Sequence, residues 1–163
     1  AAAACAIAAG ANGQQIAAGL ANVSAVAGRL EIKTAADGSV VIDDSYNASP
    51  RSFEVAIDVL AKYPGRRVLV MGDMAELGDD AASLHRRVGG YAQRAAIDAL
   101  YSLGDLSANA SEAFGGSHFE DRDLLAEALT QELQSAPVTF LVKGSRSAHM
   151  EQTVDMLLTR GNA

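Results

Sequence analysis

The chain has 163 residues, of which 49% are hydrophobic and 20% are charged, and its formal net charge is −7. This length and apolar content suffice for one well-packed domain and exclude a disordered chain. Aromatic residues make up only 5% of the chain and tryptophan is absent, which favours helices packed on a sheet over an aromatic-rich β-sandwich. We therefore expect one α/β domain accompanied by a smaller remnant.

Charge and cysteine content narrow the range of partners and compartments. The net charge of −7 repels a phosphate backbone at long range, and the 13 lysines and arginines are scattered along the chain. The longest apolar run, Ala1–Ala9, is far shorter than the roughly 20 residues of a membrane span, and no basic residue precedes it as in a signal peptide. Cys5 is the only cysteine, and no Cys/His cluster has metal-ligand spacing. We expect a cytoplasmic monomer that binds no nucleic acid, does not insert into a membrane and carries no metal ligands of its own.

The first 29 residues predict two short helices, over 1–9 and 14–20, followed by an irregular segment over 22–29. The first helix begins in an alanine run with no capping residue and no initiator methionine, which is typical of a chain cut from a longer one. Two helices of this length cannot bury a core of their own.

From Leu30 onward the pattern becomes that of a sheet. Strands over 30–34 and 40–44 flank Asp37-Gly38, a strong hairpin signal in which both central residues adopt positive φ. Ser49 and Pro50 are the N-cap and first residue of a helix that extends to Tyr63. Apolar strands then alternate with helices: strands over 68–71, 99–103 and 138–142 with a short one near His118, and helices over 84–95, 106–114, 121–133 and 150–158. This alternation predicts a doubly wound, Rossmann-like α/β fold whose mostly parallel sheet has helices on both faces and is entered by a β-hairpin.

Ligands of such sheets bind at the carboxyl ends of the strands, and polar residues gather at these positions. Asp43–Asn47 follows one strand: a carboxylate there can accept hydrogen bonds from a ribose, and the next helix N-terminus favours a phosphate, although an aspartate-rich turn that only caps the helix has the same pattern. Gly72–Gly78 carries two acids, with His85 beyond it; a solvated loop with a surface histidine fits equally well.

The third polar segment, Lys143–Ser147, places two cations and two hydroxyls where the last strand meets the last helix. A carboxylate or phosphate is a natural ligand there, and the alternative is a helix start capped by Ser147 with solvated charges. The chain has neither a G-x-x-x-x-G-K-[ST] loop nor a G-x-G-x-x-G fingerprint, so it offers no recognised phosphate cradle. His118 and His149 have no partner pattern and are interpreted as structural or surface residues.

Together the three segments, Asp43–Pro50, Gly72–Gly78 with His85, and Lys143–Arg146, resemble the Mur ligase family in their order and spacing. The resemblance covers about residues 20 to 158. Ser49 stands where the family more often has Asn, and Ala25 lies near a position where it usually has Pro. Within the family, the Gly72–Gly78 loop is most similar to that of the members that join D-alanyl-D-alanine to UDP-N-acetylmuramoyl-tripeptide.

The resemblance implies an ATP- and Mg-dependent amide ligase of peptidoglycan synthesis that acts in the cytoplasm. In this family the tripeptide carboxylate is phosphorylated to an acyl phosphate, which the amine of D-Ala-D-Ala then attacks. It further implies that residues 1–29 are the end of a central ATP-binding domain with its junction, that residues 30–163 are the C-terminal domain, and that the magnesium ligands lie outside this chain. The fragment alone is then expected to be inactive.

The resemblance also assigns roles to single residues. Arg29 would reach the ATP phosphates and Asp44 would bind the ribose, with Tyr46 and Asn47 beside the nucleotide. Ser145 and Arg146 would line the acceptor pocket, and Lys143, Asp73 and Glu76 are further candidates for substrate contact. No residue is an evident general base. The segment from Ala25 to Leu30 would act as a mobile hinge between domains. Two alternatives stay open: a non-catalytic nucleotide- or anion-binding module, and a sibling Mur or folylpolyglutamate ligase with another acceptor.

Overall fold

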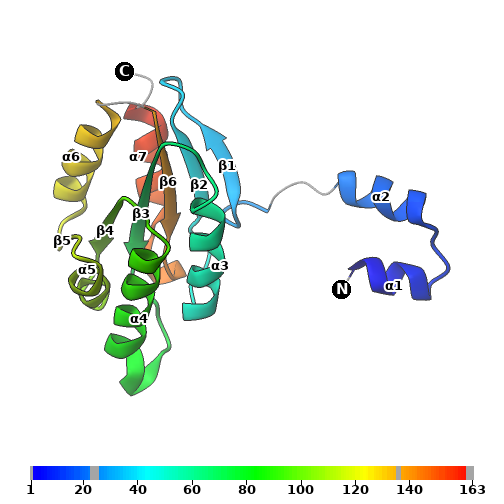
Figure 1. Cartoon of the computed structure of the whole chain (residues 1–163), viewed down its shortest axis with the longest axis horizontal. Coiled ribbons are helices and arrows are strands. Elements are labelled where there is room, and N and C mark those ends of the chain that lie inside the picture. Colours follow the sequence, from blue (N-terminus) through cyan, green and yellow to red (C-terminus); the bar gives the residue numbers. More distant parts are fainter. Residues whose placement is uncertain (1, 23–25, 135–136, 161–163) are drawn as a thin grey trace.

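The computed structural model describes residues 2–22, 26–134 and 137–160 (Figure 1). Two short helices come first, α1 (Ala2–Ala8) and α2 (Gly13–Ala21). The described residues of the remaining chain form a six-stranded sheet with five α-helices and two 3₁₀ turns. In chain order these are β1 (Glu31–Thr34), β2 (Val40–Asp44), α3 (Pro50–Leu60), β3 (Arg66–Gly72), η1 (Gly78–Asp80), α4 (Ala81–Arg94), β4 (Ala99–Leu103), α5 (Ala108–Phe114), β5 (Ser117–Phe119), α6 (Arg122–Leu133), β6 (Val138–Lys143), η2 (Arg146–Ala148) and α7 (Glu151–Arg160).

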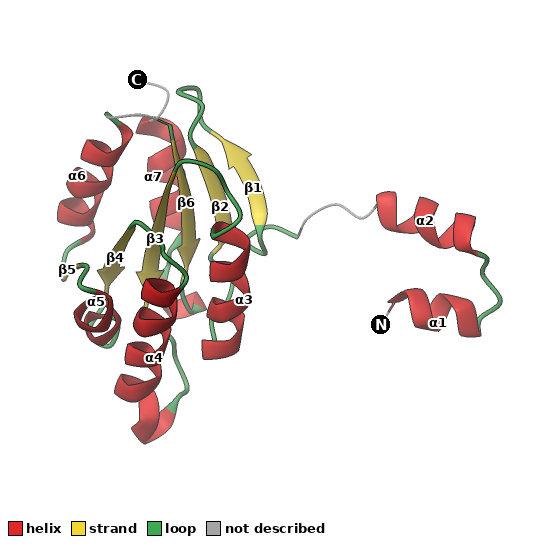
Figure 2. Cartoon of the chain, in the orientation of Figure 1, coloured by secondary structure: helices red, strands yellow, loops and turns green. Residues whose placement is uncertain are grey.

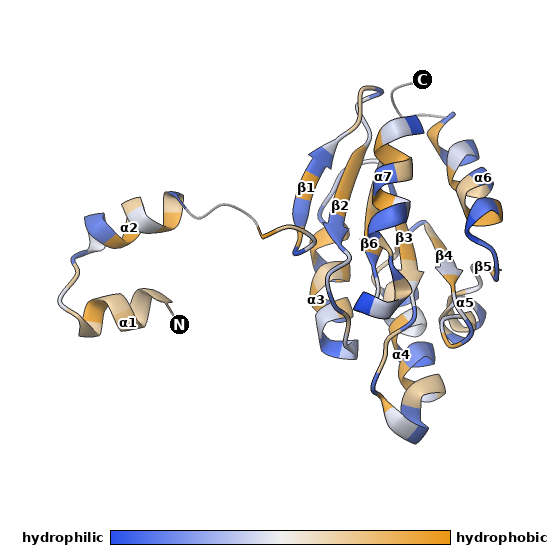
Figure 3. Ribbon diagram, turned by 180° about the vertical axis from the view of Figure 1, so that it is seen from behind, coloured by the Kyte–Doolittle hydropathy of each residue, from blue (hydrophilic) through white to orange (hydrophobic). Residues whose placement is uncertain are grey.

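The sheet has the strand order β1-β2-β6-β3-β4-β5 (Figure 2). β1 pairs antiparallel with β2, and every other neighbouring pair of these strands is parallel. Helices α3, α4 and α5 cover one face, whereas α6 and α7 cover the other, as the views from the front and from behind show (Figures 1 and 3). The predicted doubly wound, mostly parallel sheet entered by a hairpin is therefore confirmed.

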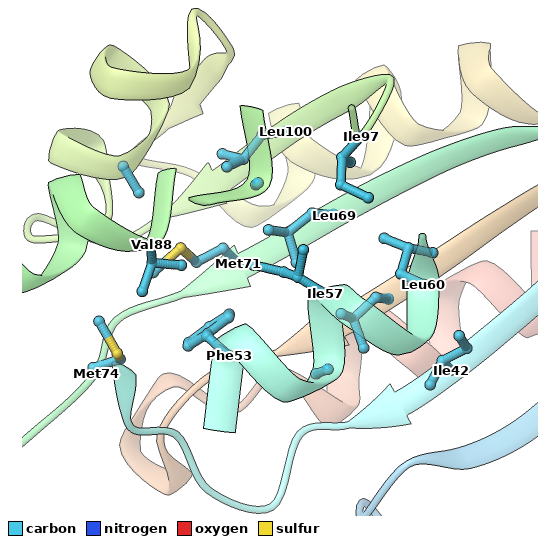
Figure 4. Packing of buried hydrophobic residues seen from close by; sticks show 14 residues of the cluster. Ile42, Phe53, Ile57, Leu60, Leu69, Met71, Met74, Val88, Ile97 and Leu100 are labelled. Carbon is cyan, nitrogen blue, oxygen red and sulfur yellow. The ribbon is translucent and has the colours of Figure 1, made fainter. Parts of the chain in front are cut away.

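Alternating side chains of the central strands fill two cores. Along β3, Val68 and Val70 pack against α6 and α7, while Leu69 and Met71 pack against α3 and α4, because successive residues of a strand point to opposite faces. Phe53 and Ile57 of α3 are fully buried in the core between the sheet and helices α3 and α4 (Figure 4). Because these strands are buried on both faces, their sequences are continuous apolar runs, and this is the pattern from which a parallel sheet was predicted.

The first two helices bury no side chain, and Figure 1 shows them apart from the sheet. Helix α2 nevertheless has a well-defined start, because Asn12 and Gln15 form a reciprocal capping box with bonds of 2.9 Å. No helix in the described ranges is long and apolar enough to span a membrane.

The hairpin turn and some element boundaries differ in detail from the prediction. The hairpin turn has positive φ only at Gly38, not at Asp37, because the loop runs over 35–39 and is closed by bonds from Ala35 N–H to Ser39 O and from Gly38 N–H to Ala35 O; Gly is needed at that one left-handed position. Helix α3 ends at Leu60, three residues before the predicted end, because the N–H groups of Lys62 and Tyr63 bond three residues back and tighten the chain into a turn.

Strand β3 begins at Arg66, two residues before the predicted start, since Arg66 and Arg67 already pair with β6. The side chains of both arginines also have acidic partners. Arg66 binds Glu132 of α6 with two hydrogen bonds, one of 2.7 Å, and Tyr101 donates to the same carboxylate at 2.6 Å. The Arg66 guanidinium holds the pKa of Glu132 below its ordinary value. Burial and the bond to Glu132 raise the pKa of Tyr101 to about 12.

We expect this cluster to make the fold sensitive to acid. A carboxyl whose pKa is lower in the folded state stabilises the fold above its unfolded pKa of about 4.3, and that contribution is lost as the pH falls through the folded pKa. Urea denaturation between pH 7 and pH 3 should therefore show the free energy of unfolding falling below about pH 4. Glu132→Gln should flatten part of this decline. The same decline in both proteins would contradict a contribution from Glu132.

Candidate functional site

The polar segments selected from the sequence lie at the carboxyl ends of β2, β6 and β3, which are neighbours in the sheet. Asp44 at the end of β2 is the register partner of Lys143 at the end of β6, and Lys143 is in turn the partner of Met71 in β3. Two cavities open at this edge and share the segment 46–49 as a common wall. We call them the Arg29 cavity, of about 490 Å³, and the Arg146 cavity, of about 750 Å³.

The Arg29 cavity lies between the segment 28–30, the end of β2 and the first turn of α3. All four residues that the resemblance places beside a nucleotide contribute to its lining, together with residues of α3 and the end of β6: Gly28, Arg29, Leu30, Asp44, Tyr46, Asn47, Ala48, Ser49, Arg51, Ser52, Val55 and Lys143. Folding thus brings together side chains from three separate parts of the sequence.

Asp44 is held on both of its oxygens. Oδ2 accepts a 2.6 Å bond from Lys143 Nζ, and Oδ1 accepts a 3.1 Å bond from the backbone N–H of Leu30. The side chain is 13% exposed and lines the cavity. Because each carboxylate oxygen can accept two hydrogen bonds, Asp44 keeps acceptor capacity for a hydroxyl ligand.

The Arg29 guanidinium stacks on the ring of Tyr46. Its guanidinium carbon lies 4.4 Å from the centre of the Tyr46 ring, a cation–π contact. Beside it, Tyr46 N–H donates to Gly28 O at 3.0 Å. A Cβ at Gly28, where φ is +70°, would come within 3.1 Å of Tyr46 N, so glycine permits this close approach. Residues 28–30 are therefore bound to the end of β2. The hinge expected over Ala25 to Leu30 stays a prediction, and Ala25 is outside the described residues.

Of the two neighbouring aspartates, only Asp44 lines a cavity. Asp43 accepts a 2.7 Å bond from Lys33 and bonds from the hydroxyl and N–H of Ser45. Burial disfavours the charged form of Asp43, but these donors outweigh it and hold its pKa below the ordinary value. Asp43 thus fixes the turn, as the alternative interpretation of this segment predicts for an aspartate.

Lys143 is buried, with a side chain only 2% exposed. Besides the bond to Asp44, its ammonium donates to Asn47 O at 2.8 Å and lies 5.4 Å from the centre of the Phe53 ring. Burial lowers its pKa, and Asp44 offsets that shift in part. The sequence groups Lys143 with Arg146 in one anion site; the structure separates them, because Lys143 lines the Arg29 cavity and Arg146 the other.

The Arg146 cavity is lined by the shared wall, the loop 75–77 and the segment after β6, including Glu76, Ser145, Arg146, Ser147 and His149. The Arg146 side chain is 66% exposed, and its guanidinium lies 3.4 Å from Glu151. Ser145 is buried and donates its hydroxyl to Asp73 O at 2.7 Å. Glu76 has a φ of +61°, an unusual backbone conformation for a residue with a side chain.

Asp73 lies outside this cavity, contrary to its grouping with the acceptor residues. Its carboxylate accepts bonds from Ser107 N–H at 2.7 Å and Leu106 N–H at 3.3 Å, at the start of α5. It lines a third cavity of about 350 Å³ together with Arg122. Sequence spacing could not reveal that backbone N–H groups after β4 donate hydrogen bonds to this carboxylate.

His85 is fully buried, which contradicts the alternative of a surface histidine. Its Nε2 accepts from Met74 N–H at 2.9 Å and its Nδ1 donates to Ala81 O at 2.7 Å. Helical spacing places it on the inner face of α4 beside Val88, which is the signal that could have indicated burial. His85 fixes the start of the Gly72–Gly78 loop.

Two further residues of these cavities were not among the expected ligand contacts: Arg51 was not singled out from the sequence, and His149 was interpreted as a structural or surface residue. Arg51 follows Pro50 in the first turn of α3 and lines the Arg29 cavity; its place after a predicted N-cap could have indicated this. His149 lines the Arg146 cavity. It adopts a left-handed φ of +49° after η2 and approaches Glu151 at 3.4 Å. No sequence signal marks that turn.

A magnesium ion does not fit the residues present. In the described ranges, no group of three or more His, Cys, Asp or Glu side chains could hold a metal ion. Of the carboxylates that line the cavities, Asp44 is bound by Lys143 and Asp73 by the start of α5.

Comparison with known proteins identifies the family. The domain described as "Mur ligase, glutamate ligase domain" matches residues 28–146. The UDP-N-acetylmuramoyl-tripeptide–D-alanyl-D-alanine ligase of Escherichia coli is 46% identical over 163 residues, covering 99% of this chain and 36% of the relative. The chain thus spans about a third of the length of such relatives.

Solved structures agree with the sequence relatives. MurF from Acinetobacter baumannii superimposes with a TM-score of 0.88 at 32% identity, over 96% of this chain and 35% of that one. MurF from Thermotoga maritima, solved in complex with ADP, gives a TM-score of 0.73 at 27% identity, over 87% of this chain and 33% of that one. The chain therefore belongs to the Mur ligase family.

Proposed function

We propose that this chain is the C-terminal domain of a cytoplasmic, ATP-dependent ligase that joins D-Ala-D-Ala to UDP-N-acetylmuramoyl-tripeptide in peptidoglycan synthesis. Residues 1–29 would be the end of the central domain with its junction, and residues 30–163 the C-terminal domain. The proposal is supported by the 46% identical relative of that name and by the match that begins at residue 28. The intact ligase would act as a monomer.

The observation that carries the proposal is the pair of cavities on either side of the segment 46–49. A ligase of this kind must hold a nucleotide and an amine acceptor next to each other, since the activated carboxylate has to meet both. One wall shared by two cavities provides this proximity, which is where much of the rate enhancement of a two-substrate reaction originates.

In the Arg29 cavity, Arg29 would bind the ATP phosphates, since a guanidinium fork suits phosphate oxygens. The free acceptor sites of Asp44 would bind the ribose, with Tyr46 and Asn47 beside the nucleotide. The ADP bound by the Thermotoga maritima relative supports a nucleotide as the ligand. Because the chain itself offers no cluster for magnesium among its described residues, the metal ligands would belong to the rest of the ligase.

In the Arg146 cavity, Arg146 would bind the carboxylate of D-Ala-D-Ala, with Ser145 and Glu76 in the same lining. The reaction has two steps. The tripeptide carboxylate first takes the terminal phosphoryl group of ATP, and ADP leaves. The dipeptide amine then attacks that carbonyl, a C–N bond forms, the amine loses a proton and inorganic phosphate leaves. This chain would contribute by positioning and by charge, the main means of catalysing phosphoryl transfer.

The test is an assay of the full-length protein that contains this chain, with ATP, UDP-N-acetylmuramoyl-tripeptide and a panel of acceptors. We expect an amide product only with D-Ala-D-Ala-like dipeptides, with one ADP and one phosphate released per bond. The 163-residue chain alone should form no product. Preference for a single amino acid, or for glutamate added to a folate, would instead establish the sibling function, and binding without turnover would establish a non-catalytic module.

Arg146→Ala in the full-length ligase should raise the KM for D-Ala-D-Ala by roughly tenfold to a hundredfold, the usual effect of losing a charge-assisted hydrogen bond. The KM for ATP should change by less than about twofold, because Arg146 does not line the Arg29 cavity. Arg86→Ala, which removes an exposed arginine of α4 paired with Glu112, is the matched control. If only the KM for ATP rose, Arg146 would contact the nucleotide and not the acceptor.

A further inference from the structure

The strongest unexplained feature of the site is the buried ammonium of Lys143. A charged lysine is rarely fully buried without a specific partner, because removing it from water costs free energy. Here the ammonium binds two points of one loop, the carboxylate of Asp44 at 2.6 Å and the carbonyl of Asn47 at 2.8 Å. These two residues are the ends of the segment that presents Tyr46, so a single cation fixes both ends.

The contacts continue from Lys143 to Arg29. The second oxygen of Asp44 accepts the N–H of Leu30. Leu30 has a left-handed φ of +49°, a strained conformation for a residue with a side chain that persists only where its surroundings hold it. Leu30 directly follows Arg29, whose guanidinium stacks on Tyr46. Through the Asp44 carboxylate and the Asn47 carbonyl, Lys143 is thus connected to all four residues assigned to the nucleotide.

The same geometry argues against direct contact of Lys143 with the acceptor. Its side chain is 2% exposed, and it does not line the Arg146 cavity. Its ammonium is engaged by Asp44 and Asn47 and lies against the Phe53 ring. Burial among these groups, and not a lack of donors, keeps the ammonium away from an acceptor in the Arg146 cavity.

We propose that Lys143 is a positioning residue for nucleotide binding: it acts through Asp44 and Asn47, and it touches neither the acceptor nor the reacting atoms. This inference rests on the proposed function and refines it. Lys143 sets the orientation of the Asp44 carboxylate and, through Asn47, the position of the segment 46–49 between the two cavities. Its removal should weaken nucleotide binding and leave acceptor binding intact.

The test is a steady-state comparison of Lys143→Met in the full-length ligase with wild type. We expect the KM for ATP to rise about tenfold and the KM for D-Ala-D-Ala to change less than about twofold. Lys33→Met is the matched control, because Lys33 makes the equivalent 2.7 Å bond to the neighbouring Asp43 and lines neither cavity. An unchanged KM for ATP, an equal rise in Lys33→Met, or a rise confined to D-Ala-D-Ala would each overturn the proposal.

A second comparison does not depend on the stability of Lys143→Met. The double variant Asp44→Asn with Lys143→Met leaves no unpaired buried charge, so it remains measurable if the single variant fails to fold. If Lys143 acts through Asp44, the double variant and Asp44→Asn alone should have the same KM for ATP within about twofold. A further tenfold rise in the double variant would contradict a role through Asp44. Failure of wild type to form the amide product would contradict the proposed function itself.

Discussion

Asp44→Ala will lower the free energy of unfolding of the 163-residue chain by about 3 to 5 kcal/mol, the usual cost of removing one partner from a buried ion pair. The variant leaves the Lys143 ammonium buried without its carboxylate and the N–H of Leu30 without its acceptor. Urea denaturation followed by circular dichroism measures the change. In the full-length ligase, the same substitution should raise the KM for ATP by roughly tenfold to a hundredfold.

Asp44→Asn is the control for this prediction. Asparagine keeps one acceptor oxygen, which can accept from either Lys143 or Leu30 N–H, while its NH2 group faces the other donor. It therefore retains one of the two bonds without the charge, and the loss of stability should be smaller than with alanine. If Asp44→Ala unfolded at the same urea concentration as wild type, the ion pair would contribute nothing to the fold. If stability fell and the KM for ATP did not change, Asp44 would be a structural residue only.

Gly89→Ala will destabilise the chain by about 2 kcal/mol or more, although alanine is the better helix former by about 1 kcal/mol. Gly89 lies on the buried side of α4, where a Cβ would come within 2.1 Å of the carbonyl oxygen of Ala110 in α5. The atom in the way belongs to the backbone, so α5 itself must move. Thermal and urea denaturation of the 163-residue chain should both report the loss.

The neighbouring Gly90 provides a matched control in the same helix. A Cβ at Gly90 would meet only the end of the Arg94 side chain, at 3.4 Å. Gly90→Ala should therefore stabilise the chain by up to about 1 kcal/mol through helix propensity alone. Equal stability of the two alanine variants would show that α4 and α5 do not pack as closely as the structure has them.

The fold could be predicted from the sequence because its strands carry clear local signals. Strands such as β6, with all its residues buried, give uninterrupted apolar runs, and Ser49-Pro50 marks a helix start whose capping box with Ser52 is present. Errors arose where tertiary contacts decide the boundary. Arg66 belongs to β3 through its pairing with Val138 of β6, and its side chain binds Glu132, 66 residues away. No local pattern contains either partner.

The edge of the sheet that carries the site was also predictable, since parallel strands bring their carboxyl ends together. Which polar groups face a ligand and which face each other was not. Spacing does not show that Lys143 pairs with Asp44 across 99 residues, or that Asp73 is taken up by the start of α5. The stacking of Arg29 on Tyr46 likewise depends on the left-handed backbone at Gly28 and Leu30. The contacts that join residues 28–30 to the end of β2 were not predictable either, and the mobility expected of the Arg29 segment stays a prediction.

We expect a nucleotide to bind on one side of the segment 46–49, in the Arg29 cavity. In a nuclear magnetic resonance experiment, the isotopically labelled 163-residue chain is titrated with a non-hydrolysable ATP analogue, a method that detects the weak binding expected of part of a site. The amide signals of Gly28–Leu30 and Asp44–Asn47 should shift, and those of Arg146–His149 should stay unchanged. Shifts confined to Arg146–His149, or to residues around Arg122, would contradict this expectation.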